Sequence, residues 1–345
     1  MKRSGSHSSP EQPTVQDVAR LARVSVGTVS HVLTGSRYVR PETVRRVEQA
    51  IERLGFRPNR VAQALIRQRT NTIGMIIPDV ANPFFAELLR GAEEVLGTAD
   101  YAVVFGNSDN DPRKQQRYVD AFRDHRVDAV IMAVASESDA DEIKALASEV
   151  PMVIVDRLVP TWDGDSVVGD NHAGMELMVG HLVELGHRRI ALVNGNPWLS
   201  TARHRREGFE AALRLRGLAA VSVTSGAFTL ESGQQQVAGL LRSADRPTAI
   251  CAGNDLLALG ALAAAKEAGL RVPRDLSVAG YDDIAYASLA SPSLTTVWQP
   301  ARSMGAEAAR LVLDRLAGGS GPGRQVVMKP RLVVRESTAP IGDEG

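Results

Sequence analysis

Residues 14–33 of this chain read TVQDVARLARVSVGTVSHVL, and this stretch predicts two short helices joined by a tight turn. Thr14 and Asp17 form a capping-box-like start for the first helix, because a threonine oxygen can accept from a free amide and a carboxylate suits the positive helix end. Ser25 is placed to cap the second helix. Each helix has one apolar face at helical spacing, formed by Val15, Val18, Ala19 and Ala22 in the first and by Val26, Val29, Val32 and Leu33 in the second.

The second of these helices carries small and polar residues beside its apolar face. Gly27, Thr28, Ser30 and His31 stand between its valines. A helix this short, rich in β-branched residues and containing a glycine, is not stable alone in water and needs a partner helix. This arrangement is typical of a helix-turn-helix, whose second helix enters the major groove of DNA.

The charge distribution supports a DNA-binding head. The whole chain of 345 residues is formally neutral, but residues 1–70 hold 13 Lys and Arg against 5 Asp and Glu, while residues 71–345 hold 27 against 35. A basic module of +8 joined to an acidic body of −8 is the charge pattern expected of a DNA-binding domain on a larger protein.

A third helix is predicted over 41–54, with a proline at its first position and Gly55 at its end. The segment after it holds Leu65 among Arg60, Arg67 and Arg69. A leucine flanked by arginines beside a DNA-binding head fits a wedge that enters the minor groove. The residues alone fit an ordinary connector, with the leucine in a small core, equally well.

The remaining chain alternates short apolar runs with helical patterns, which is typical of repeated βαβ units and of parallel sheets covered on both faces. The runs are 73–78, 102–105, 129–133, 152–155, 190–193, 249–252 and 277–280, and the helical patterns include 84–97, 113–124, 173–186 and 205–217. No glycine-rich dinucleotide motif, phosphate-binding glycine–lysine loop or GxSxG motif is present. We therefore predict no catalytic residue and no cofactor.

The composition argues against export and against metal binding. The chain has one cysteine, so it cannot form an intrachain disulfide, and no cluster of cysteine and histidine suggests zinc. Residues 1–13 are polar, so we expect a disordered tail and not a signal peptide, and no apolar run is long enough to span a bilayer. These features predict a cytoplasmic protein.

Polar residues follow the apolar runs at the ends where parallel sheets bind ligands. They are Asp79, Asn82, Asn107, Asp109, Asp156, Arg157, Asp170, Asn171, Asn254, Asp255, Asp282 and Asp283. About half of such residues are expected to be helix caps only, and Asn82 before Pro83 is the clearest example. The others would suit a ligand with many hydroxyl groups, because each hydroxyl both donates and accepts.

Residues 14–70 resemble the head of the LacI/GalR family of bacterial transcription regulators, and the resemblance continues to Thr338. It rests on the motifs TVQDVA at 14–19, Val24-Ser25 with TVS at 28–30, GFRPN at 55–59 and AQAL at 62–65. The resemblance implies that Leu65 enters the minor groove and that Val26, Gly27 and His31 face bases. The full set of residues that we expect at DNA is Thr14, Ser25, Val26, Gly27, Thr28, Ser30, His31, Asn59, Arg60, Ala62 and Leu65.

Two residues of the head depart from the family pattern. Arg23 stands where glycine is usual in the turn, which would strain a left-handed backbone modestly. His31 replaces a more usual basic or amide residue. The operator sequence therefore cannot be transferred from relatives.

The resemblance also implies an effector site in the body. The positions that match effector contacts are Phe84, Phe85, Thr201, Arg205, Phe228, Asn254 and Asp282. Thr201 matches the purine-binding branch, but Leu199 stands where that branch has an arginine. We therefore expect a sugar or glycoside as effector, with a purine or nucleoside as the alternative.

The expected fold is an all-α helix-turn-helix head followed by an α/β core of two lobes, similar to periplasmic binding proteins, in a homodimer that binds a pseudo-palindromic operator. The expected parts are a tail at 1–13, the head at 14–57, a hinge helix and linker at 58–71, the core at 72–338 and a tail at 339–345. Within the core we place lobe 1 at about 72–167 and 299–323, and lobe 2 at about 168–298 and 324–338. The end of the chain has no leucine heptads, so we expect no coiled coil there.

Two other functions fit parts of the sequence. A sugar-binding protein without a regulatory role would share the body, but it would leave the basic head without a purpose and would require export. An enzyme would need an acid–base pair, for which His187 and His204 near Asp170 are the candidates, yet no spacing places a nucleophile beside either histidine.

Overall fold

The structure is a computed structural model that describes residues 13–34, 37–56, 69–137 and 140–341. The contacts divide the chain into two compact units, Met1–Asn71 and Thr72–Gly345. We call the first unit the head and the second the body, and each is described by itself.

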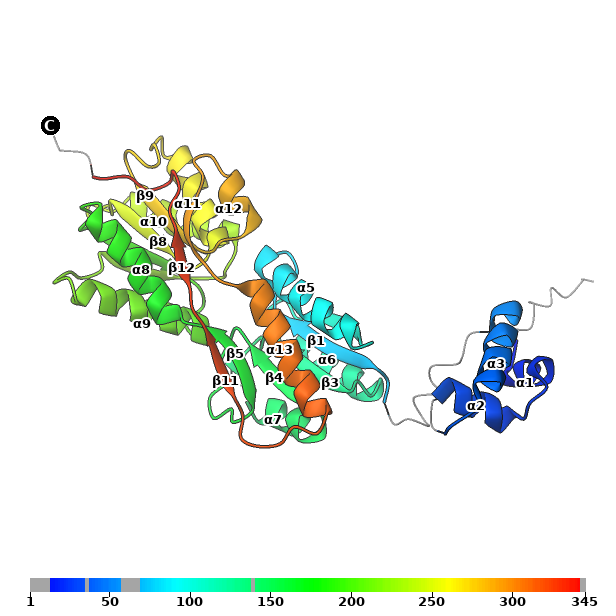
Figure 1. Ribbon diagram of the computed structural model, residues 1–345. Helices are drawn as coiled ribbons and strands as arrows, with labels where there is room; N and C mark the ends of the chain where they lie inside the picture. The colour runs from blue at the N-terminus through cyan, green and yellow to red at the C-terminus, as the bar shows by residue number, and fades with distance from the viewer. Residues whose placement is uncertain (1–12, 35–36, 57–68, 138–139, 342–345) are drawn as a thin grey trace, which may run out of the picture. The chain divides into compact units, whose positions relative to one another are not determined.

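The described residues of the head form helices α1 (Val15–Ala22), α2 (Val26–Thr34) and α3 (Pro41–Leu54) (Figure 1). Their shared core consists of Val18, Ala19, Ala22, Val29, Val47 and Ala50. The prediction that Val26 belongs to the apolar face of α2 was wrong, because this residue is outside the cluster and 44% exposed. It lies at the first position of its helix, one turn before the buried Val29.

The predicted ends of the head helices are confirmed. The hydroxyl of Thr14 accepts from the amide of Asp17 at 3.3 Å, and the Asp17 carboxylate accepts from the Thr14 amide at 2.9 Å. Proline is the first residue of α3, and Gly55 ends that helix at φ 61°. Arg23 ends α1 at φ 54° and ψ 49°, so a side chain occupies the left-handed conformation that glycine adopts without strain.

The body contains two sheets of six strands each. The first sheet has the order β11-β5-β4-β3-β1-β2, and all of its paired strands are parallel. Its strands are β1 (Thr72–Ile77), β2 (Ala102–Asn107), β3 (Ala129–Met132), β4 (Met152–Val155), β5 (Asp165–Gly169) and β11 (Gln325–Met328). We call this sheet and its helices lobe 1.

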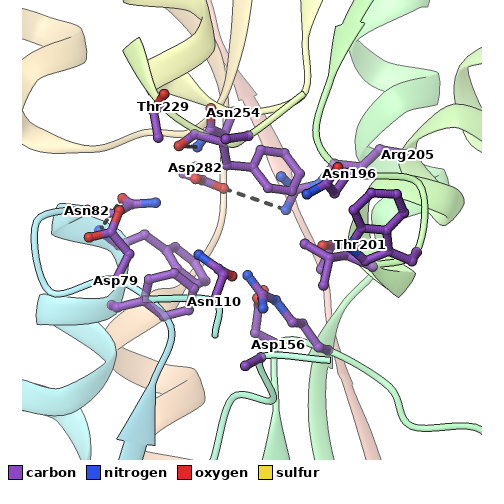
Figure 2. Close-up of a pocket in the computed structure, with 18 residues that line it drawn as sticks. Asp79, Asn82, Asn110, Asp156, Asn196, Thr201, Arg205, Thr229, Asn254 and Asp282 are labelled. Carbon is purple, nitrogen blue, oxygen red and sulfur yellow. Dashed lines mark hydrogen bonds and ion pairs between the residues drawn. The ribbon is translucent and has the colours of Figure 1, made fainter. Parts of the chain in front are cut away.

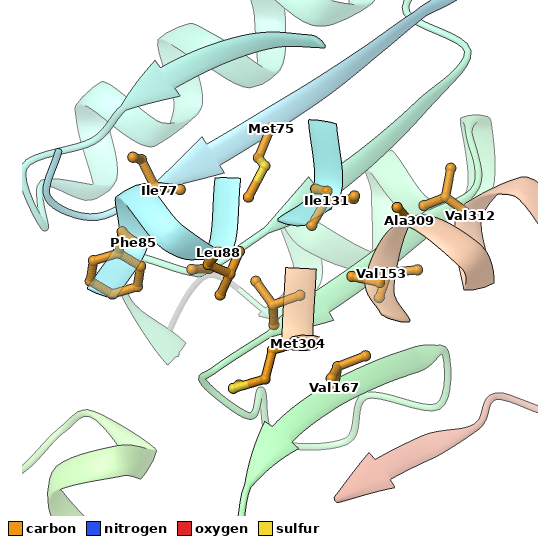
Figure 3. Close-up of a cluster of buried hydrophobic side chains, with 14 of the residues drawn as sticks. Met75, Ile77, Phe85, Leu88, Ile131, Val153, Val167, Met304, Ala309 and Val312 are labelled. Atoms are coloured by element: carbon orange, nitrogen blue, oxygen red, sulfur yellow. The ribbon is translucent and has the colours of Figure 1, made fainter. Parts of the chain in front are cut away.

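Four helices cover the two faces of the first sheet. Helices α5 (Pro83–Thr98) and α13 (Ala301–Leu316) pack on one face, around the apolar cluster drawn in Figure 3. Helices α6 (Pro112–Asp124) and α7 (Ala140–Glu149) pack on the other. Helices α5 and α13 approach so closely that a Cβ on Gly305 would lie 1.8 Å from the carbonyl oxygen of Leu88. Only glycine fits at this position.

The second sheet has the order β12-β10-β9-β8-β6-β7, with β12 antiparallel to β10. Its strands are β6 (Ile190–Asn194), β7 (Ser222–Ser225), β8 (Ala249–Ala252), β9 (Ser277–Asp282), β10 (Thr295–Trp298) and β12 (Arg331–Val333). Helices α8 (Asn171–Glu184) and α9 (Ser200–Arg214) cover one face, and α10 (Leu230–Leu241), α11 (Asp255–Glu267) and α12 (Ala285–Leu289) cover the other. This is lobe 2.

The chain passes between the lobes three times, and two of the predicted boundaries need correction. Strand β5 continues to Gly169, so this part of lobe 1 ends after the predicted residue 167. Strand β11 pairs with β5 in lobe 1, so the last crossing lies between β11 and β12 and not near residue 323. Strand β11 was not predicted because its apolar run is only three residues long, Val326 to Met328.

The segment after Thr338, which we predicted to be a tail, is bonded to lobe 2 in its first part. The amide of Ile341 donates to the Leu185 carbonyl at 2.9 Å, and the amide of Ala339 donates to the Ser277 hydroxyl at 3.2 Å. The predicted hinge residues 58–68 and the tail at 1–12 lie outside the described residues.

Candidate functional site

The start of α2 is the part of the head that we predicted to meet DNA. The Ser25 hydroxyl accepts from the Thr28 amide at 3.1 Å, which caps the helix as predicted. Ser25, Val26 and Gly27 are exposed. A Cβ on Gly27 would meet only the Ser25 hydroxyl, at 3.8 Å, so packing does not require a glycine there.

The other predicted DNA contacts in the head fall into two groups. Thr14 is exposed, and Thr28, Ser30 and His31 are half-buried on the same helix as Val26. Asn59, Arg60, Ala62 and Leu65 lie outside the described residues. The structure therefore describes an exposed helix start with small side chains, which is compatible with entry into a groove.

A cleft opens between the two lobes of the body, at the carboxyl ends of the parallel strands (Figure 2). The space between its walls, open solvent included, amounts to about 750 Å³. All seven predicted effector contacts line it: Phe84, Phe85, Thr201, Arg205, Phe228, Asn254 and Asp282. Residues far apart in the sequence are thus brought to one place.

Arg205 is the buried cation of this cleft, and α9 carries it. Its Nε donates to the Asn171 side chain at 2.8 Å, and one terminal nitrogen donates to the Gly253 carbonyl. The other terminal nitrogen lies 3.6 Å from the Asp282 carboxylate (Figure 2), and the guanidinium stands 4.0 Å from the Tyr281 ring centre. These contacts hold the guanidinium in one orientation.

Asp282 and Asp156 are buried carboxylates of the cleft. Burial raises the pKa of Asp282 to about 7, against the opposing effects of Arg205 and of the Gln299 amide, which donates to it at 2.8 Å. Burial also raises the pKa of Asp156. Both stand on backbone with positive φ, 115° at Asp282 and 64° at Asp156, and such strain tends to persist at functional sites.

Arg157 adds a second buried cation from lobe 1. It donates to the Val134 carbonyl at 2.6 Å, and its buried Nε forms an ion pair with the Asp156 carboxylate at 3.8 Å but has no hydrogen-bond partner among the described residues. Burial lowers the pKa of this guanidinium. A buried donor without a partner is costly, so a ligand oxygen at this position would stabilise the site.

Aromatic rings provide the apolar surface of the cleft. Phe84 and Phe85 meet edge to face with ring centres 5.1 Å apart, and Phe228 lies with its ring centre 5.8 Å from the Arg205 guanidinium. The indole of Trp198 also lines the cleft, although it is 63% exposed. Apolar ring faces beside convergent polar groups are typical of a site for a small polar organic molecule.

A buried carboxylate of lobe 1 reaches across to lobe 2. Glu137 accepts a hydrogen bond from the Ser200 amide at the first position of α9, and it forms an ion pair with Arg203 at 2.8 Å. The residue before the helix, Leu199, offers no side-chain cap. Beside this contact, the Leu158 amide of lobe 1 donates to the Ser200 hydroxyl at 2.8 Å.

The polar residues at the strand ends do not divide into helix caps and cleft residues as predicted, because Asn82 and Asn254 both cap a helix and line the cleft. Six line the cleft: Asp79, Asn82, Asp156, Arg157, Asn254 and Asp282. Six do not: Asn107, Asp109, Asp170, Asn171, Asp255 and Asp283. Asn82 caps α5 as predicted, and Asp170 and Asn254 cap α8 and α11.

Sequence reasoning missed several residues that line the cleft: Asn110, Ala135, Asn196, Trp198, Ala227 and Thr229. Asn196 and Trp198 lie in the turn after strand β6. Because ligands bind at the carboxyl ends of parallel strands, the residues of this turn could have been predicted to line the cleft. Asn110 follows β2 at a backbone φ of 55°.

The histidines considered as catalytic do not lie in the cleft. His187 bonds to the hydroxyls of Thr248 and Ser277, both at 3.0 Å, and to the Ala339 carbonyl. Among the described residues, no three His, Cys, Asp or Glu side chains are grouped to bind a metal ion. None of the described helices has the length and apolar character needed to cross a bilayer.

Two family models match the sequence. A model of bacterial regulatory proteins of the lacI family matches residues 14–59, and a model of periplasmic binding protein-like domains matches residues 179–338. The HTH-type transcriptional repressor PurR of Photobacterium profundum is 35% identical over 328 residues, which covers 94% of this chain and 98% of the relative.

Solved structures agree with these matches. The Lac repressor dimer bound to operator and the anti-inducer ONPF has a TM-score of 0.87 and 31% identity, covering 95% of this chain and 100% of that one. The complex of the transcriptional regulator CelR with cellobiose has a TM-score of 0.72 and 34% identity, covering 94% and 99%.

Proposed function

This chain belongs to the lacI family of bacterial regulatory proteins, which makes it a DNA-binding transcriptional regulator, and we propose that a sugar or glycoside in the cleft controls its affinity for operator DNA. Relatives of this kind are repressors and not enzymes. We propose that the protein acts in the cytoplasm. It acts as a homodimer, because two operator half-sites require a two-fold assembly.

The observation that carries the proposal is the joint lining of one cleft by both lobes. A ligand held there contacts groups from both lobes, such as Arg157 in lobe 1 and Arg205 in lobe 2. It therefore has a different affinity for each arrangement of the lobes, and this difference is the only means by which it can bias DNA binding. A coupling of about 3 kcal/mol would change operator affinity roughly a hundredfold.

The lining chemistry favours a neutral polyhydroxylated ligand. Three carboxyl groups (Asp79, Asp156 and Asp282) and two guanidinium groups line the cleft, so it offers both acceptors and donors to a ligand. Amides and two threonine hydroxyls add donors and acceptors suited to sugar hydroxyls. In the CelR relative, the bound molecule is cellobiose.

A purine or nucleoside is the second candidate. Phe84, Phe85 and Phe228 offer faces for a flat ring, and Thr201 matches the purine-binding branch. Leu199, however, is buried and apolar at the position where that branch has an arginine. The sugar therefore remains the proposed effector.

Thermal denaturation of the full chain with a set of sugars and nucleobases tests the proposed effector class. A ligand that binds the native state raises the midpoint of unfolding. A sugar is expected to do so and nucleobases are not. Stabilisation by a nucleobase alone would replace the sugar with the second candidate.

In the hinge segment we propose that Leu65 enters the minor groove, with Asn59, Arg60 and Ala62 nearby at the DNA. Leu65→Ala is expected to weaken operator binding about tenfold, because the wedge that parts a base step is lost. Fluorescence anisotropy with an operator selected from random duplexes measures this. Leu289→Ala on the surface of lobe 2, where the leucine is 78% exposed, is the control. Equal operator affinity in wild type and Leu65→Ala would refute the wedge.

A further inference from the structure

The lining of the cleft changes in character from its floor to its mouth. The floor is buried: Thr201, Arg205, Asn254 and Asp282 are all at most 6% exposed. The mouth is open, with Asn110, Trp198 and Ala227 exposed and with Asp79, Asn196 and Thr229 half-buried. The cleft therefore has a buried inner part and an open outer part.

Trp198 is the large apolar residue of the outer part, and its backbone is held in place. Its carbonyl accepts from Arg203 at 3.3 Å, and Arg203 in turn pairs with the buried Glu137. The next residue, Leu199, is 3% exposed, and its amide donates to the Asn196 carbonyl at 3.1 Å. An exposed indole thus projects from an anchored turn.

The indole of Trp198 is an exposed apolar surface that lines the cleft. Tryptophan has a large apolar surface that is favourably removed from water, and its rigid ring loses little entropy when it binds. Amide side chains lie on both sides of the outer part, with Asn110 from lobe 1 and Asn196 from lobe 2 (Figure 2). An apolar face beside amide donors and acceptors matches a sugar ring, which has apolar C–H faces and a polar edge.

We propose that the outer part is a second subsite, in which the face of Trp198 packs against a second sugar ring. This inference rests on the proposed sugar effector and narrows it. The inner part takes one ring against Arg205 and Asp282, and the effector is a disaccharide or a longer glycoside. A monosaccharide would fill only the inner part.

The test is calorimetric titration of the full chain with matched pairs, each a methyl monosaccharide and a disaccharide that carries the same sugar at its non-reducing end. Suitable pairs are methyl glucoside with cellobiose and with maltose, and methyl galactoside with lactose and with melibiose. One disaccharide is expected to bind at least tenfold more tightly than its monosaccharide. Trp198→Ala should remove that advantage and leave the affinity for the monosaccharide within about twofold.

Two further variants make the result specific. Trp198→Phe should keep most of the advantage, because it retains an aromatic face. Tyr286 is an aromatic residue of lobe 2 that is 52% exposed and outside the cleft. Tyr286→Ala should leave the affinities for the monosaccharide and the disaccharide unchanged. A disaccharide advantage that survives Trp198→Ala would overturn the subsite, as would equal affinity for both members of every pair.

The two proposals fail in different ways. If monosaccharides and disaccharides bind equally, the sugar effector stands and the outer subsite is wrong. If no sugar of any pair binds while a nucleobase does, the proposed effector class is wrong, and the outer subsite for a sugar falls with it.

Discussion

Replacing Arg205 with methionine is expected to weaken effector binding by more than a hundredfold and to abolish the response of operator binding to the effector. The guanidinium is 3% exposed and contacts Asn171, Gly253 and Asp282. Removing one partner of a buried charged pair costs about 3–5 kcal/mol, because the remaining charge is left without compensation. The positive charge of Arg205 also lowers the pKa of Asp282. Without it, this carboxyl becomes harder to ionise.

The matched control is Arg206→Met, one position further along α9. Arg206 is 53% exposed at its side chain and pairs with Glu210 on the same helix, at 2.7 Å. Calorimetry with the stabilising sugar measures effector affinity, and fluorescence anisotropy measures operator affinity. Operator binding without effector should stay within about threefold in both variants. Normal effector response in Arg205→Met would show that the cleft is not the effector site.

Replacing Glu137 with alanine is expected to loosen the start of α9 by about 2 kcal/mol, or roughly thirtyfold. This carboxylate supplies the cap that Leu199 lacks, and it lies at the positive end of the helix. Because Glu137 belongs to lobe 1 and α9 to lobe 2, the cap exists only while the lobes have this arrangement. The same helix carries Thr201 and Arg205, so the cap also holds two residues of the cleft.

Hydrogen exchange of the first-turn amides of α9 measures this effect. Arg203→Gln is the matched control, because it breaks the ion pair and leaves the cap. Its expected effect is at most a few-fold, since Arg203 is 40% exposed at its side chain and pairs of that kind contribute about 1 kcal/mol or less. Unchanged exchange at α9 in Glu137→Ala would mean that the contact does not hold the lobes together.

Local rules predicted much of the head and of the sheets. Capping at Thr14 and Asn82 depends on neighbouring residues and is visible in the sequence. Val26 shows the limit of such rules, because periodicity alone cannot tell an exposed position at the first residue of a helix from a core position.

Contacts between distant residues could not be predicted in the same way. Arg205 was identified by resemblance, but its partners Asn171 and Gly253 are 34 and 48 residues away along the chain. Glu137 meets α9 from the other lobe, 63 residues from Ser200. Strand β11 is recognised through its pairing with β5, because its own apolar run is only three residues long.

The central claim is that a ligand in the cleft changes the affinity of the protein for DNA. The most direct test is the operator affinity of the full chain, measured by fluorescence anisotropy with and without a saturating concentration of the stabilising sugar. A change of about tenfold or more is predicted, in the range of typical allosteric coupling, and it should vanish in Arg205→Met. Identical operator affinity with the sugar bound and absent would contradict the account.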